Sequence, residues 1–244
     1  MSYRKMLSFV AALAVLFATT TATFATGSEN PISDKKNVRI LTPLNIAILI
    51  QDDLISQVGN ELNITREFIR SLPAGSRVMT GYITSGTLQV RQPFTTDLDR
   101  AARSLRIPLA SGAASPFNPY VEVSEALRRF DAGWKGNNAV LLISDGLDTS
   151  RGFDSGAAGN TLDLHRAIKH ANERNVAVYS FYAPSVGLTS RSRLAASYGQ
   201  SSLNRLASET GGKAFFQGTT GFVSFDSHFR RLREALNAQY AMAN

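Results

Sequence analysis

The sequence predicts an α/β protein with a doubly wound, mostly parallel sheet, helices on both faces and one antiparallel edge strand. Three observations support this fold class. Short apolar runs recur along the chain, as expected for strands that are buried on both faces. Amphipathic stretches with helical spacing separate these runs. Two adjacent segments are joined around Ser85-Gly86, which is typical of a hairpin.

The first half of the domain begins with the run LNIAILI at 44–50, which is apolar almost throughout and predicts a central strand. A helix follows, because apolar residues recur at helical spacing until Pro73 stops it. The elements predicted in this half are the strand 44–50, the helix 58–72, the hairpin strands 77–84 and 87–92, and the helices 97–107 and 121–130.

The second half repeats the alternation, and Gly211-Gly212 closes a helix in the way that a left-handed C-cap prefers. The stretch 184–200 is rich in Ser, Arg and Gly, and it predicts a long surface loop of the kind that often carries function. The other elements predicted here are the strands 138–144, 176–182 and 213–217, and the helices 162–174, 202–210 and 225–239.

The N-terminal segment has the pattern of a secretory signal peptide over residues 1–25. Arg4 and Lys5 precede an apolar run that is too short to span a hydrocarbon core of ~30 Å, and Thr23-Phe24-Ala25 provides a cleavage site. An uncleaved membrane anchor is the alternative. Residues 26–43 then form a leader, and residues 44–240 form the domain. Since no later apolar run reaches a membrane-spanning length, we expect a secreted or periplasmic protein without an integral span.

Composition and motifs exclude several classes of protein. The 244 residues contain no cysteine, so disulfide scaffolds and thiolate metal sites are excluded. The net charge is +7; loss of Arg4 and Lys5 with the signal leaves 24 basic and 19 acidic residues, or +5. Basic side chains such as Arg100, Arg103 and Arg106 form a solvated helical stripe without interleaved aromatic residues, so no nucleic acid is expected as a partner.

Neither a nucleotide-binding loop nor a Gly-x-Ser-x-Gly elbow is present, which disfavours nucleotide chemistry and serine hydrolysis. His165 and His170 are five residues apart on one predicted helix, a spacing that does not place two metal ligands on the same face. We therefore expect these histidines to lie at the surface or to pack between helices.

Acidic side chains follow two of the predicted central strands. Asp52 and Asp53 come after the first strand, with Ser56 three residues beyond Asp53, and Asp145 follows the strand 138–144. Ligands of doubly wound sheets bind beyond the carboxyl ends of the strands, and hard oxygen ligands suit Mg²⁺ or Ca²⁺. The alternative is structural: Asp52 or Asp53 caps the following helix, and Asp145-Gly146 forms a turn.

The order of elements, the segment LNIAILIQDD, the hairpin and the segment NAVLLISDG together resemble the von Willebrand factor type A domain, in particular bacterial secreted proteins related to it. The resemblance covers about residues 43–240. It implies a Rossmann-like fold with a metal-ion-dependent adhesion site at the upper edge of the sheet. In that site, a cation joins the domain to an acidic group of a protein partner.

The adhesion site implied by this resemblance is degenerate. Gln51, Asp53 and Ile55 occupy the three positions of the family's Asp-x-Ser-x-Ser motif, and a shifted alignment uses Asp52, Asp53 and Ser56 instead. The family's threonine has no clear counterpart, and Asn118 offers the amide oxygen in that loop. The predicted metal ligands for Mg²⁺ or Ca²⁺ are Asp53 and Asp145, with Asp52, Ser56 and Asn118 as further candidates.

The function implied is a secreted, non-enzymatic binding module of the von Willebrand factor type A class, which mediates protein–protein interaction or adhesion with or without a cation. Phe117 and Tyr120 lie in the predicted loop above the sheet, where they either pack down or contact a partner. Two alternatives stay open. One is an extracytoplasmic hydrolase with a metal-activated water, and the other is an accessory subunit that docks an envelope assembly through its basic helices.

Overall fold

The computed structural model describes residues 39–110, 118–134, 137–153, 160–218 and 223–241. The predicted signal peptide and most of the leader therefore lie outside the described residues. The elements are β1 (Leu44–Gln51), α1 (Val58–Arg70), β2 (Arg77–Thr84), β3 (Thr87–Thr95), α2 (Leu98–Arg103), α3 (Pro119–Leu127), β4 (Asn137–Ser144), α4 (Leu162–Glu173), β5 (Val176–Tyr182), α5 (Arg193–Glu209), β6 (Ala214–Phe215) and α6 (Asp226–Ala241).

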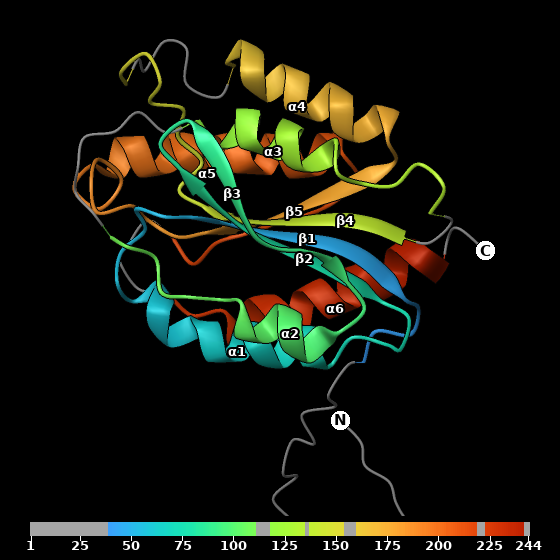
Figure 1. Ribbon diagram of the computed structural model, residues 1–244. Coiled ribbons are helices and arrows are strands. Elements are labelled where there is room, and N and C mark those ends of the chain that lie inside the picture. The colour runs from blue at the N-terminus through green and yellow to red at the C-terminus, as the bar shows by residue number, and fades with distance from the viewer. Residues whose placement is uncertain (1–38, 111–117, 135–136, 154–159, 219–222, 242–244) are drawn as a thin grey trace, which may run out of the picture. The chain divides into compact units, whose positions relative to one another are not determined.

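The six strands of the described chain form one sheet in the order β3-β2-β1-β4-β5-β6. Neighbouring strands are parallel except for the β2–β3 hairpin, which places one antiparallel strand at the edge. Helices α1, α2 and α6 cover one face of the sheet, and α3, α4 and α5 cover the other (Figure 1). The strand order reverses between β1 and β4, so the predicted fold class is confirmed.

Strand β1 lies between two hydrophobic clusters and is buried along its whole length. Ile46, Ile48 and Ile50 belong to the cluster under α1 and α6, while Ala47 and Leu49 belong to the cluster under α3 and α4. Because successive side chains of a strand point to opposite faces, an apolar residue is needed at nearly every position. This is why the run at 44–50 has no polar alternation.

The predicted long loop at 184–200 is wrong in its second half, because α5 begins at Arg193. The Ser192 side chain caps this helix by accepting a hydrogen bond of 3.2 Å from the Ala195 backbone N–H. The many Ser, Arg and Gly residues of this stretch lie on a helix that buries only small residues such as Ala196 and Gly199 in its first half. Two other helix predictions also shift: α2 ends at Arg103, and α3 begins at Pro119.

The last residues of the predicted leader pack against the domain. Ile40 is 6% exposed and belongs to the core. The Asn237 side chain of α6 donates to the Arg39 carbonyl at 2.8 Å and accepts from the Leu41 N–H at 3.2 Å. The chain therefore enters β1 from the edge of the sheet opposite to the carboxyl ends of the parallel strands.

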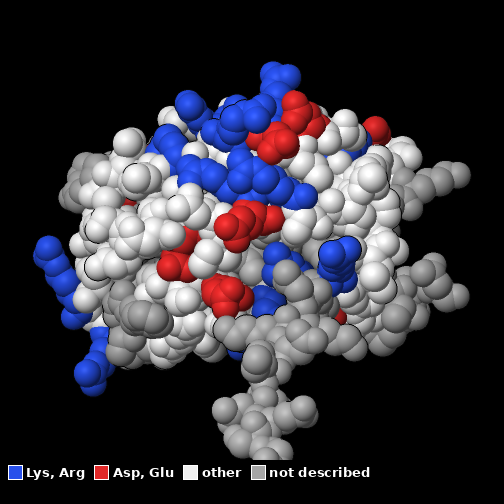
Figure 2. Space-filling view, turned by 90° about the horizontal axis from the view of Figure 1, so that it is seen from below, with Lys and Arg blue, Asp and Glu red and all other residues white. Residues whose placement is uncertain are grey.

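The face covered by α1, α2 and α6 carries many arginine side chains, with acidic side chains among them (Figure 2). The Arg70–Asp99 pair joins α1 to α2 at 2.8 Å, and both side chains are largely exposed. Arg100 and Arg103 are exposed, as predicted for a solvated stripe. The prediction is wrong for Arg106, which turns inward and binds Asp52.

Candidate functional site

The carboxyl ends of β1, β4 and β5 meet at one edge of the sheet, which we call the carboxyl edge. Gln51 ends β1, Ser144 ends β4 and Tyr182 ends β5, and the register of these parallel strands brings the three ends together. The acidic residues that the sequence singles out follow two of these ends. Their side chains, however, have different partners.

Asp52 is 4% exposed and forms a two-point ion pair with Arg106. Its two carboxylate oxygens accept from the two guanidinium nitrogens at 2.6 and 2.8 Å. The Leu109 N–H also donates to the carboxylate at 3.0 Å, and the Ala110 N–H donates to the Asp52 carbonyl at 3.1 Å. Asp52 therefore holds the segment 106–110 against the carboxyl edge, and we refer to this arrangement as the clamp.

Tyr82 of β2 completes the clamp. The Arg106 guanidinium lies 4.1 Å from the centre of the Tyr82 ring, and the Tyr82 hydroxyl accepts from the Arg106 N–H at 2.7 Å. A cation over an aromatic ring adds electrostatic attraction to the ion pair. The Asp52 pair raises the pKa of Arg106, so the guanidinium stays charged. Neither Asp52 nor Asp53 caps α1, whose N-cap Gln57 makes no side-chain capping bond.

Gln51 stands where the resemblance places the first metal-ligating aspartate, and its amide oxygen and nitrogen both form hydrogen bonds inside the protein. The amide nitrogen donates to Asp53 at 2.7 Å. The amide oxygen accepts from the Ser144 hydroxyl at 2.5 Å and from the Asp145 N–H at 3.2 Å. The side chain thus links the ends of β1 and β4 without a charge.

Asp145 is 3% exposed, and both of its carboxylate oxygens accept hydrogen bonds. The donors are the Leu147 N–H at 3.0 Å and the Thr189 hydroxyl at 3.1 Å. Burial raises the pKa of Asp145. Burial, together with the nearby charge of Asp145, also raises the pKa of Asp53 to about 7. Asp53 is therefore close enough to Asp145 for that charge to disfavour its own ionised form.

The loop between β5 and α5 covers this acidic pair. The Ile55 N–H donates to the Pro184 carbonyl at 3.0 Å, and the Val186 N–H donates to the Asp53 carbonyl at 2.9 Å. A β-bridge joins Leu54 to Ser185 between these bonds. The backbone that carries Asp53 is therefore fixed by the same loop that supplies Thr189 to Asp145.

The remaining predicted ligands do not converge on the acidic pair. Ser56 is exposed beyond the end of β1, and Ile55 packs against the hydrophobic core. The Asn118 oxygen caps α3 by accepting from the Tyr120 N–H at 3.2 Å and the Val121 N–H at 3.4 Å. An oxygen used in this way is directed at the helix rather than at Asp53 or Asp145.

The donor set does not fit the adhesion site that the resemblance implies. Gln51 and Asn118 use their oxygens internally, Ile55 has none, and Asp52 is paired with Arg106. Among the described residues, no three His, Asp or Glu side chains gather as a metal-binding group. Cation binding by Asp53 and Asp145 is the expectation from the sequence, and the internal hydrogen bonds of this donor set lead us to expect the opposite. We expect calorimetry to give no heat with Mg²⁺ or Ca²⁺ at micromolar concentrations, and strong binding would contradict the conclusion that this donor set does not fit a cation.

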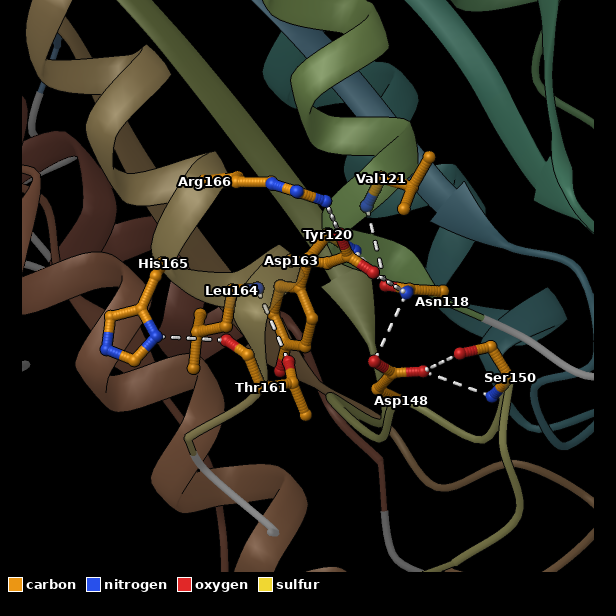
Figure 3. A network of polar contacts seen from close by, with 10 residues as sticks. All are labelled: Asn118, Tyr120, Val121, Asp148, Ser150, Thr161, Asp163, Leu164, His165 and Arg166. Carbon is orange, nitrogen blue, oxygen red and sulfur yellow. Dashed lines mark hydrogen bonds and ion pairs between the residues drawn. The ribbon is translucent and has the colours of Figure 1, made fainter.

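A second polar network, which the sequence reasoning missed, lies beside α3 and α4 (Figure 3). The Asn118 amide nitrogen donates to one oxygen of Asp148 at 3.1 Å and to one oxygen of Asp163 at 2.9 Å. Arg166 pairs with Asp163 at 3.1 Å, and the Ser150 hydroxyl donates to Asp148 at 2.6 Å. Asp163 lies in the first turn of α4, so its sequence position is typical of an ordinary helix start and gives no sign of this network.

Large apolar side chains are exposed on the loops and helix starts at the carboxyl edge. Ile107 is 60% exposed, Leu109 is 66% exposed, and Leu162, at the start of α4, is 62% exposed. Tyr120 was one of the two aromatic residues predicted in this region, but it is fully buried and its hydroxyl donates to the Gly146 carbonyl. The other, Phe117, lies outside the described residues.

His165 is a surface residue and His170 is half-buried on α4, in line with the prediction for these two histidines. His165 is exposed on α4, with its Nδ1 at 3.1 Å from the Thr161 carbonyl. His228 of α6 is 2% exposed and contacts the rings of Phe181 and Phe225. Burial lowers the pKa of His228 to about 4, so the imidazole is neutral near pH 7.

No protein-family profile and no curated protein matches the sequence. Solved structures do match. An aerotolerance-related membrane protein from Bacteroides fragilis aligns with 81% of this chain and 100% of its own, at 15% identity and a TM-score of 0.53. BatB from Bacteroides thetaiotaomicron, described as a conserved hypothetical protein, aligns with 82% of this chain and 100% of its own, at 15% identity and a TM-score of 0.57.

A von Willebrand factor type A protein from Catenulispora acidiphila aligns with 80% of this chain and 43% of its own, at 16% identity and a TM-score of 0.53. At such low identity, these matches establish the fold alone. The fold is that of the von Willebrand factor type A domain, which confirms the resemblance seen in the sequence.

Proposed function

We propose that this chain, which has the von Willebrand factor type A fold, is a non-enzymatic protein-interaction module that contacts its partner through the carboxyl edge. The clamp is the observation that carries the proposal. It fixes the segment 106–110 with a buried ion pair while Ile107 and Leu109 remain 60% and 66% exposed. Apolar side chains that are exposed on rigid backbone favour binding, because little conformational entropy is lost when a partner covers them.

The proposed contact does not use a cation, since the internal donors that surround Gln51 take the oxygens that a metal would need. An extracytoplasmic location is part of the proposal, and it is based on the signal-peptide pattern over residues 1–25. In the described ranges, no helix combines the length and the apolar character that crossing a bilayer requires. N-terminal sequencing of the mature protein would show cleavage after Ala25 if the pattern is read correctly.

We expect Leu109→Glu to weaken partner binding at least about tenfold, because a charge would be buried where an apolar side chain was covered. Leu41→Glu is the matched control, since Leu41 is 79% exposed at the opposite edge of the sheet. Binding is measured by competition in extracts of the source cells. The measured quantity is the amount of each variant that is needed to displace the parent protein from the partner. Equal losses in both variants would contradict the proposal.

The alternative of an accessory subunit that docks through basic helices makes a different prediction. Its charge-reversal test has to use Arg100 and Arg103 and leave Arg106 unchanged, because Arg106 holds Asp52. Arg100→Glu with Arg103→Glu leaves the clamp intact and changes only the face covered by α1, α2 and α6. Loss of the partner in this variant, with binding retained in Leu109→Glu, would favour the docking subunit.

A further inference from the structure

A groove runs from the β2–β3 hairpin tip along α3 and α4. It consists of three adjoining hollows of about 500, 420 and 420 Å³. Asp163 lines all three, Glu122 lines two of them, and Gly86 at the hairpin tip lines the same two. The shared lining residues make the hollows continuous from the hairpin to the loop that follows β4.

Glu122 of α3 is the unusual group in this groove. It is 4% exposed, and it has no hydrogen-bond or ion-pair partner within the described part of the chain. Burial and the nearby charge of Glu125 raise the pKa of Glu122. Its carboxylate lines the groove, where a cation or a hydrogen-bond donor of a ligand can reach it. The Glu122 side chain can therefore bind a cation or a hydrogen-bond donor that the described residues do not supply.

The charges around Glu122 are mostly balanced by one another. Arg128 and Arg129 pair with Glu125 at 2.9 and 3.1 Å, and Arg166 pairs with Asp163 at 3.1 Å. Arg151 is exposed and lines two of the hollows, one together with Asp148 and the other together with Glu122. Among the described residues, Glu122 and Asp148 are the carboxylates of the groove that lack an ion-pair partner.

Asp148 and Asp163 point toward the same side of the groove, because the Asn118 amide nitrogen lies between their carboxylates (Figure 3). The cap of α3 fixes the orientation of this amide, since its oxygen accepts from the helix N–H groups. Phe153 and Leu162 provide apolar surface beside the two acids. The groove thus offers carboxylates for a cationic head group and apolar walls for an aliphatic stem.

From this arrangement we infer that the groove binds an arginine or lysine side chain of the protein partner. The carboxylates without an ion pair, Glu122 in two of the hollows and Asp148 in the third, attract its charge. The inference rests on the proposed function, and it names the chemistry of the partner. The polarity is opposite to that of a metal-bridged adhesion site, because here the domain supplies the acids and the partner supplies the cation. Charge complementarity between a groove and its partner gives specificity as well as affinity.

The test uses N-acetyl-arginine amide and N-acetyl-lysine amide as probes, with N-acetyl-norleucine amide as the neutral control, in an NMR titration of the ¹⁵N-labelled protein. We expect saturable shifts at the amides of Gly86, Val121 and Asp163, with a dissociation constant on the order of millimolar. Glu122→Gln should weaken this binding at least about tenfold. Glu173→Gln, which removes an exposed acid from the far end of α4, should leave it unchanged.

Asp148→Asn is the second variant, and it should weaken the arginine probe even if Glu122→Gln fails to fold. Shifts that are equal for the norleucine probe, or that persist in both variants, would overturn the inference. Displacement of the arginine probe by Mg²⁺ at the same amides would also overturn it, because the groove would then be a metal site. The titration needs no partner, so its failure leaves the test with Leu109→Glu and Leu41→Glu unaffected.

Discussion

Asp52→Ala is expected to lower the free energy of unfolding by about 3–5 kcal/mol, which is the cost of removing one partner from a buried ion pair. The Asp52 and Arg106 side chains are 5% and 25% exposed, so the guanidinium would be left partly buried without its counter-charge. The Leu109 N–H would also lose its acceptor. Urea denaturation followed by circular dichroism measures the loss.

Asp99→Ala is the matched control, because it removes an acid from another arginine pair, whose contact distance is 2.8 Å against 2.6 Å for Asp52 and Arg106. Arg70 and Asp99 are 45% and 62% exposed, and solvent-exposed pairs contribute less than about 1 kcal/mol. A loss in Asp52→Ala that is no larger than the loss in Asp99→Ala would mean that the clamp does not hold the segment 106–110.

Gly199→Ala is expected to destabilise the protein by about 3 kcal/mol or more, although alanine in a helix interior is ordinarily stabilising by roughly 1 kcal/mol. Gly199 of α5 lies directly against the backbone that follows β4. A Cβ at this position would overlap the Asp145 carbonyl oxygen, and a Cβ at Gly146, whose φ is 73°, would overlap the Gly199 carbonyl oxygen. The helix cannot move away without also moving Asp145 from Thr189.

The control for this variant is Gly187→Ala, in the loop that covers the acidic pair. The nearest atom to a Cβ at Gly187 is the Ser185 hydroxyl oxygen at 3.8 Å, an ordinary van der Waals contact. We expect its unfolding free energy to stay within about 0.5 kcal/mol of the parent protein. Thermal unfolding of both variants tests whether Gly199 of α5 packs directly against the backbone at Asp145. A Gly199→Ala protein that is more stable than the parent would refute this packing.

Sequence reasoning predicts most of the fold because the strongest signals are local. The apolar runs at 44–50, 138–144 and 176–182 become β1, β4 and β5 with ends shifted by at most one residue. The start of α5 is missed because small residues, rather than large apolar ones, form its buried side. The small residues are needed because α5 packs closely on the end of β4 at Gly199. Hydrophobic periodicity does not detect a buried helix face that is made of small residues.

The candidate site is less predictable, because its partners are distant in the sequence. Asp52 and Asp145 do lie at the carboxyl edge as expected. Their roles are set by Arg106, which is 54 residues from Asp52, and by Thr189, which is 44 residues from Asp145. Glu122 looks like an ordinary first-turn acid in α3, and only the three-dimensional structure shows that it is buried without a partner.

Photo-crosslinking from single positions tests most directly the claim that the carboxyl edge binds the partner. A photoreactive amino acid replaces Leu109 or, in the control, Leu41, and both proteins are irradiated in extracts of the source cells. The two sites are 66% and 79% exposed on opposite edges of the sheet. We predict one adduct from position 109 whose formation is suppressed by an excess of unlabelled parent protein but not by Leu109→Glu protein. The account would be contradicted if position 41 gave the same adduct, or if parent protein and Leu109→Glu protein suppressed the adduct from position 109 equally.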